Sequence, residues 1–64
     1  MNLSDAEDLR KRKHAKLHFY DEFLEGKILE VHSFGSRGEG EVFFENEWTG
    51  NRQWYPVHFI TNAR

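Results

Sequence analysis

The sequence predicts one small α+β domain, in which an amino-terminal helix over residues 5–25 precedes a three-stranded antiparallel meander within residues 27–60. Three observations lead to this fold. No proline or glycine interrupts the chain before Gly26, as expected of a continuous helix. After Gly26, apolar and polar residues alternate as they do in half-buried strands. All ten aromatic residues follow His18, so the later part of the chain can bury a small core.

The predicted helix has signals at both ends. The Ser4 hydroxyl can accept a hydrogen bond from the Glu7 amide while the Glu7 side chain reaches back to the Ser4 amide, which makes a capping box. Gly26 is well placed to cap the other end. An alternative interpretation makes residues 16–23 a strand, because apolar and polar residues also alternate there. The apolar residues at roughly helical spacing are Leu9, Leu17, Tyr20 and Leu24.

Three strands are predicted after the helix, at residues 27–34, 41–48 and 53–60. The glycine-rich residues 35–40 form a hairpin loop between the first two strands, and residues 49–51 form a turn before the third. Pro56 lacks an amide proton and so confines the third strand to a sheet edge or ends it early. Residues 61–64 are expected to fray.

The alternation within these strands predicts which side chains form the core. Leu29 and Val31 share one face of the first strand, with Ile28 on the other. Leu29 and Val31 are expected to pack against the apolar side of the helix, together with Phe44 and one of the two tryptophans. One helix covers only one face of a sheet, so the aromatic residues of the opposite face would contact water, a partner or a second copy. That opposite set is Phe43, Tyr55 and Phe59.

Composition narrows the function classes. The chain has 64 residues, a net charge of -2 and no cysteine, so disulfides and thiolate metal clusters are excluded and a cytoplasmic location is expected. No apolar run is long enough to span a bilayer, and no membrane partner is expected. Charge is segregated, because residues 10–16 carry five positive and no negative charges whereas residues 39–47 carry four glutamates and no positive charge.

No catalytic or cofactor signature stands out. His14 and His18 have the four-residue spacing that lets two imidazoles share a metal on a helix, but the residues between them lack the glutamate of metalloproteases, and we expect no metal site. His32 and His58 have no neighbouring nucleophile in sequence. The loop at residues 35–40 leads to a strand rather than to a helix, unlike a phosphate-binding loop. We therefore expect a protein without enzyme activity or cofactor.

Residues 26–60 resemble the small SH3-like barrels of the Tudor and chromo-barrel type. The resemblance rests on Lys27-Ile-Leu-Glu-Val31, a glycine turn, Val42-Phe-Phe-Glu-Asn46, Trp54-Tyr-Pro-Val57 and Ile60. It implies a barrel as the alternative fold, with residues 16–23 as its first strand. It also implies an aromatic cage that binds a methylated lysine or arginine through cation–π contact. The positions matching such a cage are Phe44, Trp48, Trp54 and Tyr55.

The surplus of aromatic residues beside four glutamates predicts a small regulatory adaptor or inhibitor that binds a protein partner through its sheet surface. The residues expected to contact that partner are Phe43, Glu45, Glu47, Trp48, Trp54 and Tyr55. The alternative is a nucleic-acid-binding module that uses a basic helical segment. Its contact residues would be Arg10, Lys11, Arg12, Lys13 and Lys16.

Overall fold

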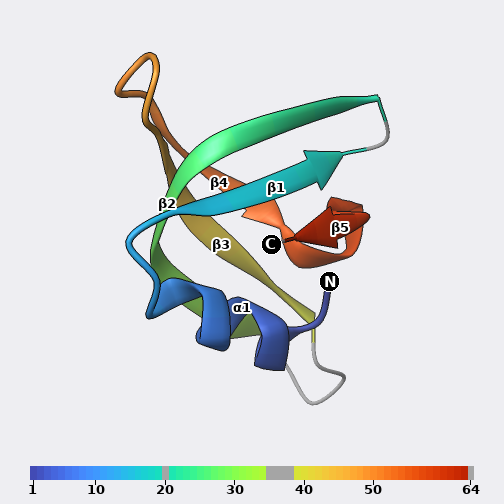
Figure 1. Ribbon diagram of the computed structural model, residues 1–64. Coiled ribbons are helices and arrows are strands. Elements are labelled where there is room, and N and C mark those ends of the chain that lie inside the picture. Colours follow the sequence, from blue (N-terminus) through green and yellow to red (C-terminus); the bar gives the residue numbers. More distant parts are fainter. Residues whose placement is uncertain (20, 35–38, 64) are drawn as a thin grey trace.

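The computed structural model describes residues 1–19, 21–34 and 39–63 and contains one α-helix and an antiparallel sheet of five strands (Figure 1). The α+β class is confirmed, but three strands is an undercount. In chain order the elements are α1 (Leu3–Arg10), β1 (Ala15–Phe19), β2 (Glu22–Phe34), β3 (Glu39–Asn46), β4 (Arg52–Pro56), the 3-10 helix η1 (Val57–Phe59) and β5 (Asn62–Ala63). The helix of this part of the chain is neither long nor apolar enough to cross a membrane.

The sheet is organised around β2, its central and longest strand. The strand order is β4-β3-β2-β1-β5, and every neighbouring pair is antiparallel. The first part of β2 pairs with β1 and the rest with β3, and Gly26 is the residue at which the two ladders meet, opposite both Ala15 and Asn46. A Cβ atom on Gly26 would overlap the carbonyl oxygen of Glu45, so this close approach requires glycine.

The predicted helix over residues 5–25 is wrong beyond Arg10, because most of residues 15–25 lie in β1 and β2. The alternative interpretation, one strand at residues 16–23, is correct for residues 16–19, which lie in β1. Asp21 lies in a turn and residues 22–23 begin the next strand, β2, which pairs with β1; Tyr20 lies outside the described residues. Buried Ala15 and Leu17 flank exposed Lys16, which is the two-residue period of a strand. Pairing with β2 satisfies this backbone, and the pairing outweighs the local preference for helix.

The start of α1 also differs from the prediction. Asn2, not Ser4, is the N-cap, and its side-chain oxygen accepts a hydrogen bond from the Asp5 amide at 2.8 Å. Ser4 is exposed. The helix buries Ala6 and Leu9 and packs on β2 and β3, at the bottom of the view in Figure 1.

The core combines side chains from α1, β1, β2, β3 and the segment after β4. Phe44 and Leu17 are buried as predicted, and Val31 and Leu24 pack against the core while partly exposed. On β2, however, Ile28 rather than Leu29 is fully buried. The ladder between β2 and β3 is irregular between Ile28 and Glu30, so the simple alternation assumed from sequence does not continue through Leu29. The buried apolar residues are Ala6, Leu9, Ala15, Leu17, Ile28, Val42, Phe44, Val57 and Ile60.

Both tryptophans lie outside the core, contrary to the prediction that one would join it. Trp48 is 77% exposed and Trp54 is 42% exposed. A turn before β4 is confirmed, with Gly50 at a φ of 76°, but the connection covers residues 47–51 rather than 49–51, because β3 ends at Asn46 and not at the predicted residue 48. β4 is an edge strand that ends at Pro56 as expected. Fraying of residues 61–64 is wrong for the described residues, because β5 pairs with β1. Of the predicted loop at residues 35–40, residues 35–38 lie outside the described part.

Candidate protein-binding surface

Four aromatic rings gather on the outer face of β2, β3 and β4, the face opposite the core. We call His32, Phe34, Phe43 and Trp54 the aromatic patch. The rings of Phe43 and Trp54 lie 4.9 Å apart between centroids, and His32 lies 6.2 Å from Trp54 and 5.0 Å from Phe34. Phe34 is 44% exposed and Trp54 is 42% exposed. The patch is therefore a continuous row of rings that extends across three strands and reaches solvent.

The strand register assembles the patch. Phe43 stands directly opposite Glu30 on β2 and Trp54 on β4, and its neighbours in sequence, Val42 and Phe44, point into the core. Cross-strand aromatic neighbours in such a register stabilise the sheet and hold one another in place. The rings are thus positioned by three hydrogen-bonded strands rather than by a loop.

This register corrects the predicted grouping of side chains on the two faces. Tyr55 was expected to share a face with Phe43, and Trp54 with Phe44. Instead Trp54 pairs with Phe43, and Tyr55 pairs with Val42 on the core side. Tyr55 packs against the Phe19 ring at 5.0 Å, and desolvation, with a smaller contribution from the charge of Glu22, raises its pKa.

The four positions that match an aromatic cage do not converge. Phe44 is buried and Tyr55 is half-buried on the core side, whereas Trp54 lies on the outer face and Trp48 extends from the turn after β3. The resemblance to SH3-like barrels itself stays a prediction.

Carboxylates border the aromatic patch. Glu30 is opposite Phe43 in the ladder, and Glu41 is opposite His32. Glu45 accepts a hydrogen bond from Arg52 at 2.7 Å, next to the Phe43–Trp54 pair. A recess of about 390 Å³ adjoins the patch, and it is lined by Arg10, Glu30, Val31, His32 and Trp54. The surface thus combines aromatic rings with an acidic border and a recess beside them.

Of the six residues predicted to contact a partner, only Phe43 and Trp54 belong to the patch, and Glu45 lies beside it. Trp48 and Glu47 lie after the end of β3, where Glu47 contacts His14. Sequence reasoning missed His32 and Phe34. Their alternation with Val31 along β2 was a usable signal, but their alignment with Phe43 and Trp54 depends on register.

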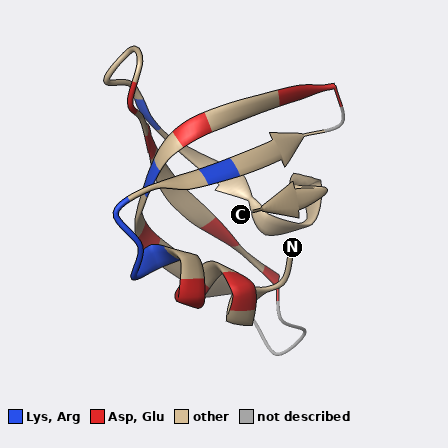
Figure 2. Ribbon diagram, in the orientation of Figure 1, with Lys and Arg blue, Asp and Glu red and all other residues tan. Residues whose placement is uncertain are grey.

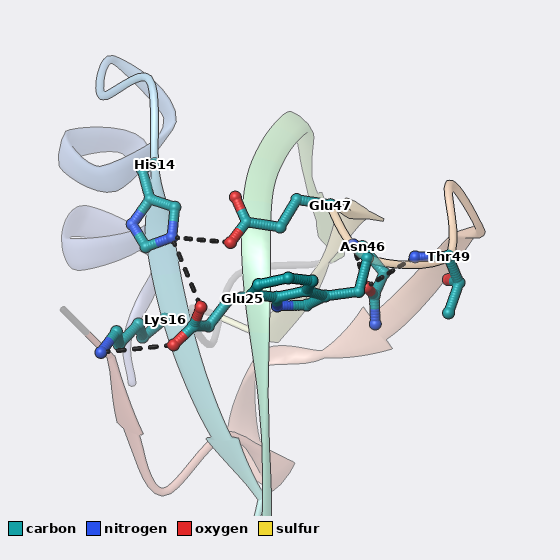
Figure 3. Close-up of polar contacts among 7 residues, drawn as sticks. His14, Lys16, Glu25, Asn46, Glu47 and Thr49 are labelled. Atoms are coloured by element: carbon teal, nitrogen blue, oxygen red, sulfur yellow. Dashed lines mark hydrogen bonds and ion pairs between the residues drawn. The ribbon is translucent and has the colours of Figure 1, made fainter.

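A second, polar cluster lies where β1, β2 and the turn after β3 meet (Figure 3). His14 Nε2 is 3.3 Å from Glu47 Oε1 and 4.0 Å from Glu25 Oε2, and Lys16 Nζ is 3.3 Å from Glu25 Oε1. The hydrogen bond from Lys16 is the main reason that the pKa of Glu25 is lowered, with desolvation opposing it. We call His14, Glu25 and Glu47 the His14 cluster. His18 is not part of it and stacks on Phe23, with ring centroids 5.4 Å apart.

The basic residues do not form the predicted helical segment. Arg10 ends α1, Lys11 is its C-cap, and Lys16 lies on β1. Figure 2 shows this basic group at the end of α1 and in the turn that follows. Arg10 lies 3.7 Å from Glu7, and Lys16 is paired with Glu25, so carboxylates already offset part of the charge.

Comparison of the chain with protein-family models, with curated proteins and with solved structures gives no match.

Proposed function

We propose that this protein is a small non-enzymatic regulatory adaptor or inhibitor of the cytoplasm that binds a protein partner through the aromatic patch. One observation carries the proposal: Trp54 and Phe34 remain over two-fifths exposed although they belong to a continuous row of contacting rings on a three-stranded support. Large aromatic side chains in such a row dominate binding energy at protein interfaces. Their rigid support reduces the entropy that is lost on binding.

The border of the patch indicates the chemistry of the partner. Glu30 and Glu41 flank the rings, and neither forms an ion pair with another described residue. A partner segment with arginine or lysine beside an apolar side chain would satisfy these carboxylates and place its cation over Trp54. We therefore expect a basic, partly apolar peptide segment as the bound element.

The test uses two matched sets of short peptides. In the basic set arginine or lysine adjoins a leucine, and in the acidic set glutamate replaces the basic residue. Binding is followed by NMR through the backbone amide signals of β3 and β4, which the native chain and the variants share. We expect the basic set to shift these signals, and Trp54→Ala to weaken binding by at least 2 kcal/mol, or about 30-fold. Phe59→Ala is the matched control, because Phe59 is 46% exposed and lies outside the patch. Equal binding by Trp54→Ala and the native chain would contradict the proposal.

Nucleic-acid binding through the basic residues is the alternative function. Salt and charge reversal would affect it differently from peptide binding at the aromatic patch. Lys11, Arg12 and Lys13 are exposed and clustered beside the end of α1. If they carry the function, binding of a nucleic acid will fall steeply with added salt and will be abolished by charge reversal at these three positions. Under the main proposal the same reversal leaves peptide binding at the patch almost unchanged, apart from a more salt-sensitive encounter.

A further inference from the structure

We propose that the His14 cluster is a binding site for a divalent transition-metal ion, with Zn²⁺ as the ion to test. No metal site was expected from the sequence, where His14 and His18, with Asp21, Glu22 and Glu25 as possible further ligands, were placed on one helix. The fold instead gathers one imidazole and two carboxylates, whose ligand atoms all lie within 4.8 Å of one another. This site is independent of the aromatic patch, so either proposal can fail without the other.

The three ligands come from separate parts of the chain that the sheet holds together (Figure 3). His14 immediately precedes β1, Glu25 lies on β2, and Glu47 follows β3. The Glu47 amide donates a hydrogen bond to the Glu25 carbonyl oxygen at 3.0 Å, which fixes the two acidic residues side by side.

The turn that carries Glu47 is also ordered by hydrogen bonds to Asn46, the residue before it. The side-chain oxygen of Asn46 accepts hydrogen bonds from the amides of Trp48 at 2.8 Å and Thr49 at 3.2 Å. Gly50 donates its amide to the Asn46 carbonyl oxygen at 2.8 Å. The backbone on which Glu47 stands is therefore held by three hydrogen bonds, so little ordering remains to be done when an ion binds.

The spacing of the donor atoms suits a small tetrahedral ion. Zinc bonds to imidazole nitrogen and carboxylate oxygen are roughly 2.0–2.2 Å long, which separates two ligand atoms on a tetrahedron by about 3.3–3.5 Å. The distance from His14 Nε2 to Glu47 Oε1 is already 3.3 Å, and that to Glu25 Oε2 is 4.0 Å. A side-chain movement of less than 1 Å brings the Glu25 oxygen to the same distance from His14 Nε2, and the two carboxylate oxygens, which lie within 4.8 Å of each other, must approach to a similar separation. The fourth position is left for water or for a donor atom of another molecule.

The charges around the site favour a cation at its centre. Glu25 and Glu47 place two carboxylates against one imidazole ring, and a divalent ion would compensate both. Lys16 contacts Oε1 of Glu25 and leaves Oε2 facing His14, so it does not occupy the position of the ion. Lys16 also repels a cation, which should make the affinity moderate.

The experiment titrates the full chain with zinc chloride in a non-chelating buffer, by calorimetry and by NMR of the histidine ring nitrogens. We expect saturable binding of one ion and a shift of the His14 Nε2 resonance. His14→Gln and Glu47→Gln should each weaken binding about tenfold or more, since removal even of a residue that supports a metal ligand costs 10–100-fold. Lys16→Gln should strengthen binding, because it removes a positive charge beside the ion.

His58→Gln and Glu45→Gln are the matched controls, since both residues are outside the cluster and should leave zinc affinity unchanged. Circular dichroism checks that each variant folds; the replaced side chains at 14 and 47 are exposed, so we expect native spectra. Absence of stoichiometric binding, or binding that His14→Gln leaves intact, would overturn the proposal. In that case the three residues form only polar contacts between the His14 ring and two carboxylates.

Discussion

Two adjacent phenylalanines on β3 provide a sharp test of which sheet face is the core. Phe44 is 1% exposed, faces Ile28 across the ladder and meets the Tyr55 ring edge-on at a centroid distance of 6.4 Å. Phe43 lies one residue earlier, on the outer face, with its ring 4.9 Å from that of Trp54 at an interplanar angle of 34°. The same substitution, Phe to Ala, should therefore have very different effects at the two positions.

The magnitudes follow from these surroundings. Phe44→Ala removes a fully buried ring and leaves a cavity, which costs about 3–5 kcal/mol. A chain of 64 residues has a total free energy of unfolding of roughly 3–10 kcal/mol, at 0.05–0.15 kcal/mol per residue. Phe44→Ala should thus leave the domain partly or wholly unfolded. Phe43→Ala removes a half-buried ring and its contact with the Trp54 ring, at a cost of about 1 kcal/mol.

The assay is urea unfolding followed by far-ultraviolet circular dichroism, with stability obtained by linear extrapolation. Phe44→Leu is a milder variant that should remain folded and lose about 1–2 kcal/mol, since fewer buried carbons are removed. A larger loss of stability from Phe43→Ala than from Phe44→Ala would refute the face assignment. It would also remove the structural basis of the aromatic patch.

Three further predictions concern the helix cap, the β2 crossing and acid stability. Asn2→Ala should lower the free energy of unfolding by about 1 kcal/mol, whereas Ser4→Ala should change it little, as measured by urea unfolding. Gly26→Ala should cost about 1–3 kcal/mol in the same assay, because the added methyl group overlaps backbone of β3. The folded state lowers the pKa of Glu25, so its contribution is present above the ordinary value of 4.5 and is lost as pH falls through the lowered value. Lys16→Gln should reduce this acid-dependent loss in pH-resolved melting, and an unchanged pH profile would contradict the assigned cause.

The sequence was sufficient for features that depend on local chemistry. Gly50 predicted the turn after β3 because its positive φ is available chiefly to glycine, and Pro56 predicted an edge strand because it lacks an amide proton. The burial of Phe44 followed from alternation within one uninterrupted strand.

Features that depend on partner strands were not predictable in this way. Residues 11–25 contain no helix breaker. A strand at residues 15–19 becomes more favourable than a helix only through the ladder with β2. The irregularity at Leu29 displaces the alternation along β2, so Ile28 took the predicted place of Leu29. Trp54 lies on the outer face because it pairs with Phe43 across the β3–β4 ladder. The turn between the strands interrupts the two-residue period, so alternation along the sequence does not predict that face.

The His14 cluster was beyond sequence reasoning for a related reason. His14, Glu25 and Glu47 are 11 and 22 residues apart in the chain, by subtraction of their numbers, and no local motif links them. They meet because β2 pairs with β1 on one side and with β3 on the other.

The pairing of β2 with both β1 and β3 also implies an order in which the strands assemble. The β1–β2 and β2–β3 ladders join strands that follow one another directly, with close pairs such as Phe19 with Glu22. The β1–β5 ladder instead pairs Leu17 with Ala63, so a long loop must close before it forms. Docking of β5 should therefore come last and open first. The Thr61 amide, which donates to the His18 carbonyl oxygen at 2.8 Å, reports that step in hydrogen exchange.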